Sequence, residues 1–115
     1  MKSGMTYKQG EILIVPFPFS DLSSVRQRPV LLLSKNVDNE QSDDIITCGI
    51  TSNLKNTGYS VVIDDASLEK GKIPKRSRIK VDKLFTLDKK IVKKSIARVN
   101  KETFEIVRNE FRKLV

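Results

Sequence analysis

The sequence predicts a mainly β fold with one helix, in which a small barrel of short strands is followed by a C-terminal helix. Six short segments rich in β-branched residues are separated by turn-forming residues, which is typical of a small antiparallel barrel. In the last segment apolar residues recur at intervals of three and four positions, which predicts an amphipathic helix. The 115 residues fit a single domain, 1–115, in which residues 1–8 are expected to form a flexible N-terminus.

Proline sets two of the expected strand ends. Because Pro16 and Pro18 cannot donate a ladder hydrogen bond, the first strand is expected to end at Val15. After a polar connection the second strand is expected to begin at Pro29, which biases Arg28 toward extended geometry. The six expected strands are Glu11 to Val15, Val30 to Ser34, Ile45 to Ile50, Tyr59 to Ile63, Arg78 to Val81 and Ile96 to Val99.

The C-terminal helix is expected to begin after Asn100, which is a favourable N-cap residue. Its apolar stripe is expected to cover the barrel, and a groove for a partner helix is the alternative interpretation. A short helical turn is also expected near Asp88 to Val92. The stripe consists of Phe104, Val107, Phe111 and Leu114.

Positive charge is concentrated in the second half of the chain. The net charge is +8, and residues 58–115 hold sixteen Lys/Arg and eight Asp/Glu, whereas residues 1–57 hold six of each. The densest run extends from Lys70 to Lys80 and contains no acidic residue. Because Gly71, Ile73 and Pro74 interrupt it, we interpret the run as a shaped loop that attracts nucleic acid, with a solvated surface loop as the alternative.

The scarce residue types exclude several function classes. Histidine is absent from the sequence, which removes the usual acid–base pair of ribonucleases, most zinc sites and most nucleophile triads. Neither Asp43-Asp44 nor Asp64-Asp65 forms a chelating cluster by itself, because neighbours on a strand point to opposite faces. The glycines are scattered and form no phosphate-binding loop. We therefore expect neither a metal nor another cofactor.

Cys48 is the single cysteine and bears on the compartment. It cannot form an intrachain disulfide, which favours a reducing cytoplasm, and it is most simply a small core residue within a strand. The N-terminus has no apolar segment long enough for a signal peptide or a spanning helix, so no membrane association is expected.

The remaining residues suit a reaction that needs only cations and hydroxyls. RNA is cleaved when its own 2′-hydroxyl attacks the adjacent phosphorus, so the protein must align the backbone and stabilise charge. Arg28 can offer a rigid fork of donors to phosphoryl oxygens, and Thr51, with Ser52 beside it, can add a hydroxyl donor. The alternatives are a surface ion pair of Arg28 with Asp21, and a turn that Thr51 and Ser52 close with Asn53.

Taken together, these blocks resemble the MazF/PemK family, the toxin endoribonucleases of type II toxin–antitoxin systems. The resemblance covers almost the whole chain and implies an SH3-like barrel of the CcdB/PemK type. It also implies a metal-independent, sequence-selective nuclease that leaves 2′,3′-cyclic phosphate and 5′-hydroxyl ends. The matching segments, in order, are Gly10-Glu11-Ile12, Val15-Pro16-Phe17-Pro18-Phe19, Arg28-Pro29-Val30-Leu31 closing on Ser34, Gly49-Ile50-Thr51-Ser52, Val81-Asp82-Lys83 and Thr86-Leu87-Asp88.

The resemblance assigns the catalytic pair to Arg28 and Thr51. In PemK-like members a basic residue and an aspartate two positions apart also contribute, and they match Lys80 and Asp82. Lysine titrates more readily than arginine when partly buried, so Lys80 can donate the leaving-group proton while Asp82 orients Lys80 or Thr51. For Asp82 the alternative is a turn carboxylate paired with Lys80 or Lys83.

The loop before the Arg-Pro motif departs from the family pattern. Many members carry Glu-Gln-Gly there, whereas this chain has Ser24-Val25-Arg26-Gln27, so no cleavage sequence is carried over. Bases are expected to stack on Phe17, Phe19 or Tyr59, and both phenylalanines have core packing as the alternative. The expected RNA contacts are Phe17, Phe19, Arg26, Lys75, Arg76 and Arg78.

The resemblance implies three partners: a single-stranded RNA substrate, a second copy of the chain in a homodimer, and a cognate acidic antitoxin. A disordered acidic tail of that antitoxin would occupy the same basic groove as RNA. The alternative function is a barrel that binds RNA or a protein without cutting, because related toxins of similar fold act on a topoisomerase.

Overall fold

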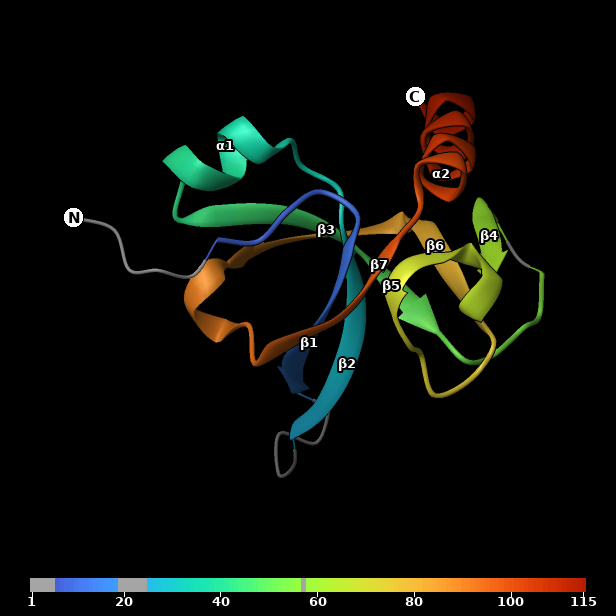
Figure 1. Ribbon diagram of the computed structural model, residues 1–115, viewed down its shortest axis with the longest axis horizontal. Helices are drawn as coiled ribbons and strands as arrows, with labels where there is room; N and C mark the ends of the chain where they lie inside the picture. Colours follow the sequence, from blue (N-terminus) through green and yellow to red (C-terminus); the bar gives the residue numbers. More distant parts are fainter. Residues whose placement is uncertain (1–5, 19–24, 57) are drawn as a thin grey trace.

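The computed structural model describes residues 6–18, 25–56 and 58–115 (Figure 1). Within them the chain forms one seven-stranded sheet, two α-helices and two 3₁₀ turns. In chain order the elements are β1 (Glu11–Pro18), β2 (Val25–Leu32), α1 (Asn36–Gln41), β3 (Asp44–Thr51), β4 (Ser60–Ile63), η1 (Asp65–Ser67), β5 (Leu68–Gly71), β6 (Ser77–Asp88), η2 (Lys89–Ile91), β7 (Lys94–Val99) and α2 (Lys101–Leu114).

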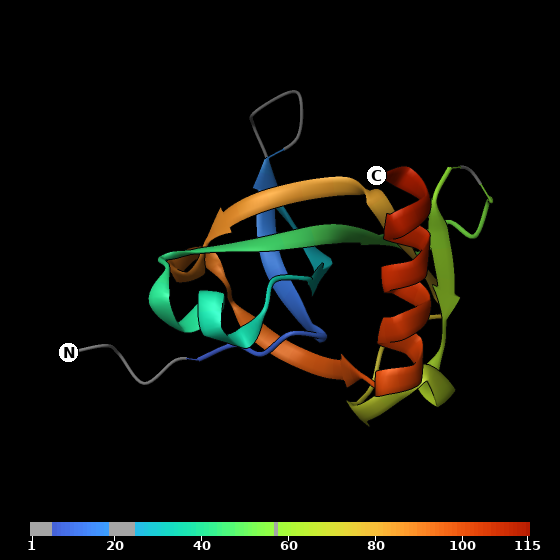
Figure 2. The same ribbon diagram turned by 90° about the horizontal axis from the view of Figure 1, so that it is seen from above.

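The sheet is antiparallel and curls into a half-barrel, with strand order β4-β6-β3-β2-β1-β7-β5. Its two edge strands, β4 and β5, are joined directly through η1, so the curl brings the two edges of the sheet to the same end of the molecule (Figure 2). This confirms the predicted mainly β barrel with a C-terminal helix.

Apolar side chains pack in two clusters on opposite faces of β1, β2 and β3. Successive residues of β2 show the alternation, because Leu31 belongs to one cluster while Val30 and Leu32 belong to the other. The central strands are therefore covered on both sides. The larger core contains Ile12, Leu31, Cys48, Ile50, Ile63, Ile79, Val81, Ala97, Val99 and Val107, and the smaller core contains Tyr7, Leu13, Val15, Val30, Leu32 and Ile45.

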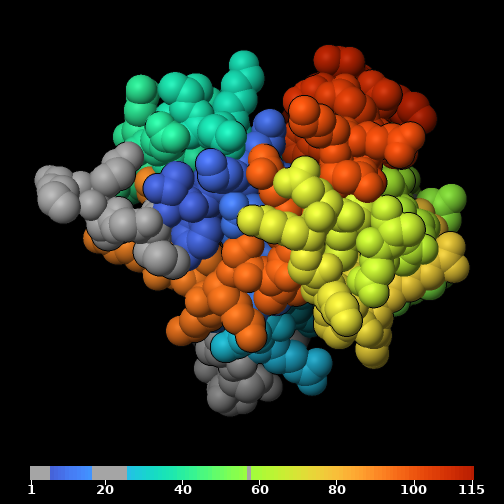
Figure 3. All heavy atoms as spheres, viewed as in Figure 1, coloured from blue at the N-terminus to red at the C-terminus, as the bar shows by residue number. Residues whose placement is uncertain are grey.

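Helix α2 covers the β4–β6 end of the sheet, as its apolar stripe predicted (Figure 2). Val107 is completely buried, and Phe104 and Phe111 pack against the larger core. The predicted N-cap is confirmed, because Asn100 Oδ1 accepts a hydrogen bond of 2.8 Å from the Thr103 N–H. The space-filling view shows α2 in red above the yellow-green segment around β5, with the teal α1 region separate from it (Figure 3).

The strand ends predicted from proline are wrong. β1 continues through Pro16 to Pro18, paired with β2, and β2 already begins at Val25. The Ile14 carbonyl accepts a hydrogen bond from Lys93 N–H, so the backbone groups of Ile14 point toward β7. Pro16 and Pro18 lie two and four residues later, so the positions where they lack an N–H also face the β7 side. The last β1–β7 pair is at Ile14, and the hydrogen bonds between β1 and β2 are therefore unaffected.

Two elements lack a strong sequence signal. Helix α1 has only six residues, too few to show periodicity, and it is held by buried Asn39, whose Oδ1 accepts from Ser34 Oγ. Strand β5 reads Leu-Glu-Lys-Gly and lacks β-branched residues. By contrast, the helical turn expected near Asp88 is confirmed as η2. Neither described α-helix has the length and apolar run needed to span a bilayer.

The expected flexible N-terminus is only partly within the described residues, which begin at Thr6. Tyr7 is buried in the smaller core, and the Lys8 N–H donates to Glu11 Oε2 at 2.9 Å. Residues 1–5 lie outside the described part.

Candidate active site

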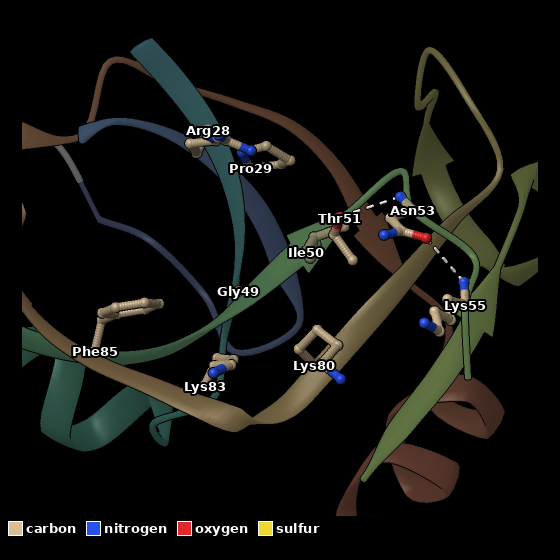
Figure 4. Close-up of a pocket in the computed structure, with 10 residues that line it drawn as sticks. All are labelled: Arg28, Pro29, Gly49, Ile50, Thr51, Asn53, Lys55, Lys80, Lys83 and Phe85. Carbon is tan, nitrogen blue, oxygen red and sulfur yellow. Dashed lines mark hydrogen bonds between the residues drawn. The ribbon is translucent and has the colours of Figure 1, made fainter. Parts of the chain in front are cut away.

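A cavity of about 380 Å³ lies between the middle of β2, the end of β3 and the bend in β6, and we call it the lysine cavity (Figure 4). Figure 4 shows Arg28 and Pro29 on one side of it and the β6 side chains on another. Its lining joins three ammonium groups and a guanidinium to one aromatic ring. The lining residues are Arg28, Pro29, Gly49, Ile50, Thr51, Asn53, Lys55, Lys80, Lys83 and Phe85.

The pairing of β2 with β3 places Arg28 and Thr51 on the same face. Val30 pairs with Gly49, Arg28 precedes Val30 by two residues, and Thr51 follows Gly49 by two. Because side chains alternate between faces with a period of two, the Arg28 and Thr51 side chains both lie on the face of that pair. Arg28 also pairs with buried Val15 of β1, which fixes its backbone from the other side.

A bulge in β6 brings two of the lysines to the cavity. Gly49 pairs with Lys80, whereas its neighbour Cys48 pairs with Leu84, so residues 81–83 have no partner in β3. Such an insertion bends the strand and changes the direction of its side chains. Lys80 lies before the bulge and Lys83 within it, and both line the cavity.

The Thr51 hydroxyl closes a turn. Its Oγ1 accepts a hydrogen bond of 3.1 Å from the Asn53 N–H, and Asn53 Oδ1 accepts one of 3.0 Å from the Lys55 N–H (Figure 4). This confirms the turn that was the alternative interpretation of Thr51. The turn uses the hydroxyl as an acceptor only, so its own hydrogen can still be donated toward the cavity.

A second hollow of about 350 Å³, which we call the adjacent cavity, shares part of its wall with the lysine cavity. Arg28, Pro29, Ile50 and Thr51 line both. Arg28 and Thr51 therefore lie between two hollows, each of which carries further cations. The adjacent cavity is also lined by Ile12, Ile14, Arg26, Gln27, Ser52, Ile73, Pro74, Lys75, Ser77 and Ile96.

Asp82 approaches Gly58 in the structure. A Cβ on Gly58 would lie 2.7 Å from Asp82 Oδ2 and 3.8 Å from Lys80 Nζ, so the carboxylate and the ammonium converge on the same point. Asp82 lies inside strand β6, so only the turn part of its alternative interpretation is wrong. Its Oδ1 is buried without a hydrogen-bond partner.

The residues predicted to contact RNA lie in different parts of the structure. Arg26 and Lys75 line the adjacent cavity, and Arg76 is exposed. Arg78 instead donates hydrogen bonds to the loop that follows β3. Tyr59 is half-buried against the larger core. Phe19, the Phe17 side chain and Asp21, the proposed ion-pair partner of Arg28, lie outside the described part of the chain.

Three charged or aromatic residues of the lysine cavity were not predicted as site residues: Lys55, Lys83 and Phe85. Lys55 follows the motif Gly49-Ile50-Thr51-Ser52 by three positions, and that proximity is a usable signal. Lys83 and Phe85 follow the matched basic residue Lys80 closely, but an alternating strand without the bulge would place the three side chains differently.

Cys48 is buried in the larger core, as predicted. Burial, and secondly the charge of Asp82, raise the pKa of its thiol to about 12, so the thiol is protonated and unreactive at neutral pH. Among residues 6–18, 25–56 and 58–115, no group of three or more Cys, Asp or Glu side chains is arranged to hold a metal ion.

The half-barrel with its cation-lined cavity has the fold of the MazF-type toxins. An endoribonuclease from a mycobacterial species, in complex with its cognate antitoxin, is 17% identical and gives a TM-score of 0.75 over 94% of this chain and 93% of that one. The Mycobacterium tuberculosis toxin MazF-mt6 is 18% identical, with a TM-score of 0.72 over 90% and 93%. A MazE–MazF complex from Deinococcus radiodurans is 20% identical, with a TM-score of 0.75 over 96% of each.

The sequence itself then defines the family. A family model for the PemK-like, MazF-like toxins of type II toxin–antitoxin systems matches residues 8–115, so the chain belongs to that family. A search of the curated proteins found none that matches this chain. Family membership supports an RNA-cleaving toxin as the general class of activity.

Proposed function

We propose that this protein is a toxin that cleaves single-stranded RNA at selected sequences, without a metal ion, by attack of the RNA's own 2′-hydroxyl. The observation that carries the proposal is the position of Arg28 and Thr51 on the wall between the two cavities. A guanidinium and a hydroxyl on one face can both donate to the oxygens of a single phosphate.

In the proposed reaction the nucleophile comes from the RNA, and the protein supplies hydrogen-bond and proton donors. The 2′-oxygen bonds to phosphorus and gives its proton to solvent, while the bond from phosphorus to the 5′-oxygen breaks. Arg28 stabilises the charge on the non-bridging oxygens, and the Thr51 hydroxyl donates to one of them. Lys80 supplies a proton to the departing 5′-oxygen. The products are a 2′,3′-cyclic phosphate and a 5′-hydroxyl.

The two cavities give a path for the RNA on either side of the cleaved phosphate. On one side Lys55 and Lys83 attract the backbone, and Phe85, which is 36% exposed, offers a ring on which a base can stack. On the other side Arg26 and Lys75 attract the backbone and Ser52 adds a hydroxyl. Selectivity for sequence then arises from bases that fit these hollows.

Asp82 acts on Lys80 in this scheme. Its carboxylate and the Lys80 ammonium converge on Gly58, so attraction between them restrains the lysine near the cavity. Asp82 is therefore proposed as a positioning residue and not as a direct partner of Thr51.

The proposal includes the partners that the family suggests. Structural neighbours include an endoribonuclease bound to its cognate antitoxin and a MazE–MazF complex. We propose that this chain forms a homodimer in the cytoplasm and is inhibited by an antitoxin with an acidic segment. Carboxylates of that segment would compete with phosphates for the cations of the lysine cavity.

The test is cleavage of a long single-stranded RNA in EDTA by the wild-type protein, Arg28→Ala and Thr51→Val. Loss of one donor to a developing oxyanion costs about 10²-fold or more, so Arg28→Ala is expected to slow cleavage by at least that factor. Arg112→Ala, on exposed α2 surface, is the charge-matched control and is expected to cleave normally.

Each other result has a defined meaning. Equal cleavage by Arg28→Ala and the wild type would remove Arg28 from the mechanism. Cleavage that requires added Mg²⁺ would refute the metal-free reaction. Tight binding of RNA without any cleavage would favour the non-cutting barrel instead.

A further inference from the structure

Arg78 directs most of its hydrogen-bond donors to the loop after β3. Its Nε and Nη2 donate to the Leu54 carbonyl at 3.3 and 3.1 Å, and its Nη1 donates to Asn56 Oδ1 at 3.3 Å and to Ser60 Oγ at 2.9 Å. A guanidinium has about five N–H donors, so a single one is left for any other acceptor. A bidentate contact with phosphate would require this arrangement to break.

The loop that Arg78 holds is part of the wall of the lysine cavity. Asn53 and Lys55 line the cavity on either side of Leu54, whose carbonyl receives two of the four hydrogen bonds. The loop's own hydrogen bonds, from Asn53 N–H to Thr51 and from Lys55 N–H to Asn53, are both local. They shape the turn and join it to the end of β3, but they do not connect it to a neighbouring strand.

The strand pairing gives Arg78 a fixed position from which to hold the loop. Arg78 lies in β6 and pairs with Thr51 of β3 on one side and with Val62 of β4 on the other, so its backbone is held between two neighbouring strands. A side chain anchored there can restrain Leu54 and Asn56 relative to Thr51, the last residue of β3 before the loop. Ser60, the last acceptor, lies at the start of β4, where the loop returns to the sheet.

We infer that Arg78 is a positioning residue, which keeps Asn53 and Lys55 beside Thr51 and does not itself bind RNA. This inference rests on the proposed function and replaces the expectation that Arg78 contacts the substrate with a different role for it. When Arg78 is removed, the RNA is expected to be aligned less well for cleavage, whereas the attraction of the protein for its phosphates is expected to remain. Lysine cannot replace Arg78, because an ammonium lacks the planar fork that reaches three acceptors at once.

The experiment compares Arg78→Ala, Arg78→Lys and Arg112→Ala. Arg112 lies on the exposed surface of α2, so Arg112→Ala removes the same charge at a site outside the loop. We measure kcat and KM separately, the salt dependence of RNA binding, and hydrogen exchange of the Asn53 and Lys55 amides. The plot of log K for RNA binding against log salt has a negative slope. Removing a residue that contacts phosphate reduces the magnitude of this slope by about 1.

For Arg78→Ala we expect kcat to fall by about 10- to 100-fold, as for a small misplacement of groups around the reacting atoms, with the salt slope of the wild type. Exchange at the Asn53 and Lys55 amides should accelerate, and Arg78→Lys should rescue neither property. A lowered salt slope with unchanged kcat would overturn the inference and make Arg78 an RNA contact. Unchanged exchange in the loop would overturn it as well.

A second variant covers the case in which Arg78→Ala fails to fold. Asn56→Ala with Ser60→Ala removes two acceptors and keeps every charge, so it should reproduce a weaker form of the same kcat loss and faster exchange. Normal kcat and normal exchange in this double variant would contradict the inference. Hydrogen exchange needs no RNA, so if the wild-type protein cleaves none, the proposed function fails while this measurement still tests the loop.

Discussion

Gly49 lies directly opposite Lys80 in the pairing of β3 with β6, at the edge of the bulge that bends β6. A residue without a side chain thus faces a lysine where the lysine cavity opens. A Cβ at Gly49 would meet Phe85 Cε2 at 3.5 Å and Lys83 Cβ at 3.7 Å, which are ordinary contact distances. Gly49 therefore adds no side-chain atoms to the wall of the cavity, and a methyl group would fit there in contact with Phe85 and Lys83.

This relationship predicts different effects for two substitutions of Gly49. Gly49→Ala should fold with a stability within about 1 kcal/mol of the wild type, because its Cβ fits and its backbone conformation suits other residues. Gly49→Leu should still fold but fill the cavity, raising the KM for RNA by about 10-fold or more. Thermal unfolding and initial rates of RNA cleavage measure the two effects. An unchanged KM for Gly49→Leu would show that RNA does not use this cavity.

We expect a large loss of stability when Gly71 is replaced by a residue with a side chain. Its φ is +81°, and a Cβ would overlap the Ile96 carbonyl oxygen and lie 2.5 Å from Ala97 Cα, both backbone atoms of β7. Left-handed strain and the displacement of β5 should together cost about 2–4 kcal/mol in the free energy of unfolding. Urea denaturation of Gly71→Ala measures it, with exposed Lys72→Ala as the control. Equal midpoints for the two variants would contradict the close approach of β5 to β7.

Helix α2 offers a matched pair of substitutions. Val107 is completely buried in the larger core, whereas its neighbour Ile106 is 48% exposed. Val107→Ala should lower the free energy of unfolding by about 2 kcal/mol through lost burial and a residual cavity. Ile106→Ala should change it by less than about 0.5 kcal/mol. Chemical denaturation of both variants compares them, and a greater loss for Ile106→Ala would place the opposite face of α2 against the sheet.

Cys48 predicts a loss of stability at alkaline pH. Its pKa is raised by burial to about 12 in the folded protein, compared with about 8.5 for an exposed thiol, so its contribution to stability is fully present below about pH 8.5. Between these two values the unfolded chain loses the proton and the folded one keeps it, and stability should fall by about 1.4 kcal/mol per pH unit. Denaturation curves from pH 8 to 11 measure this slope.

Cys48→Ala provides the control for that slope, because other groups also titrate in the alkaline range. The variant should be less stable at pH 8, since it leaves a small cavity, but its stability should fall less steeply with pH. Parallel pH profiles for the two proteins would show that Cys48 is accessible in the folded state.

Much of the fold was readable from local pattern. β-branched runs, the three- and four-residue spacing in α2 and the Asn100 cap are properties of neighbouring residues, and all of them appear in the structure. The strand ends at Pro16 and Pro29 were not readable, because a proline ends a strand only when its missing donor faces a partner. Whether it does depends on the neighbouring strand.

The candidate site shows the same division. The basic second half of the chain, the Arg-Pro motif and the hydroxyl at the end of β3 could be read from the amino-acid sequence alone. The resemblance to a family then led to the prediction that Arg28 and Thr51 act together. Three features required the folded chain: both residues lie between two cavities, a bulge turns Lys83 and Phe85 toward one of them, and Arg78 donates hydrogen bonds to the loop after β3. Charge and secondary-structure propensity are properties of single residues and their neighbours in the sequence. Strand register, bulges and hydrogen bonds such as that from Arg78 to Leu54 form only when strands distant in the sequence have paired.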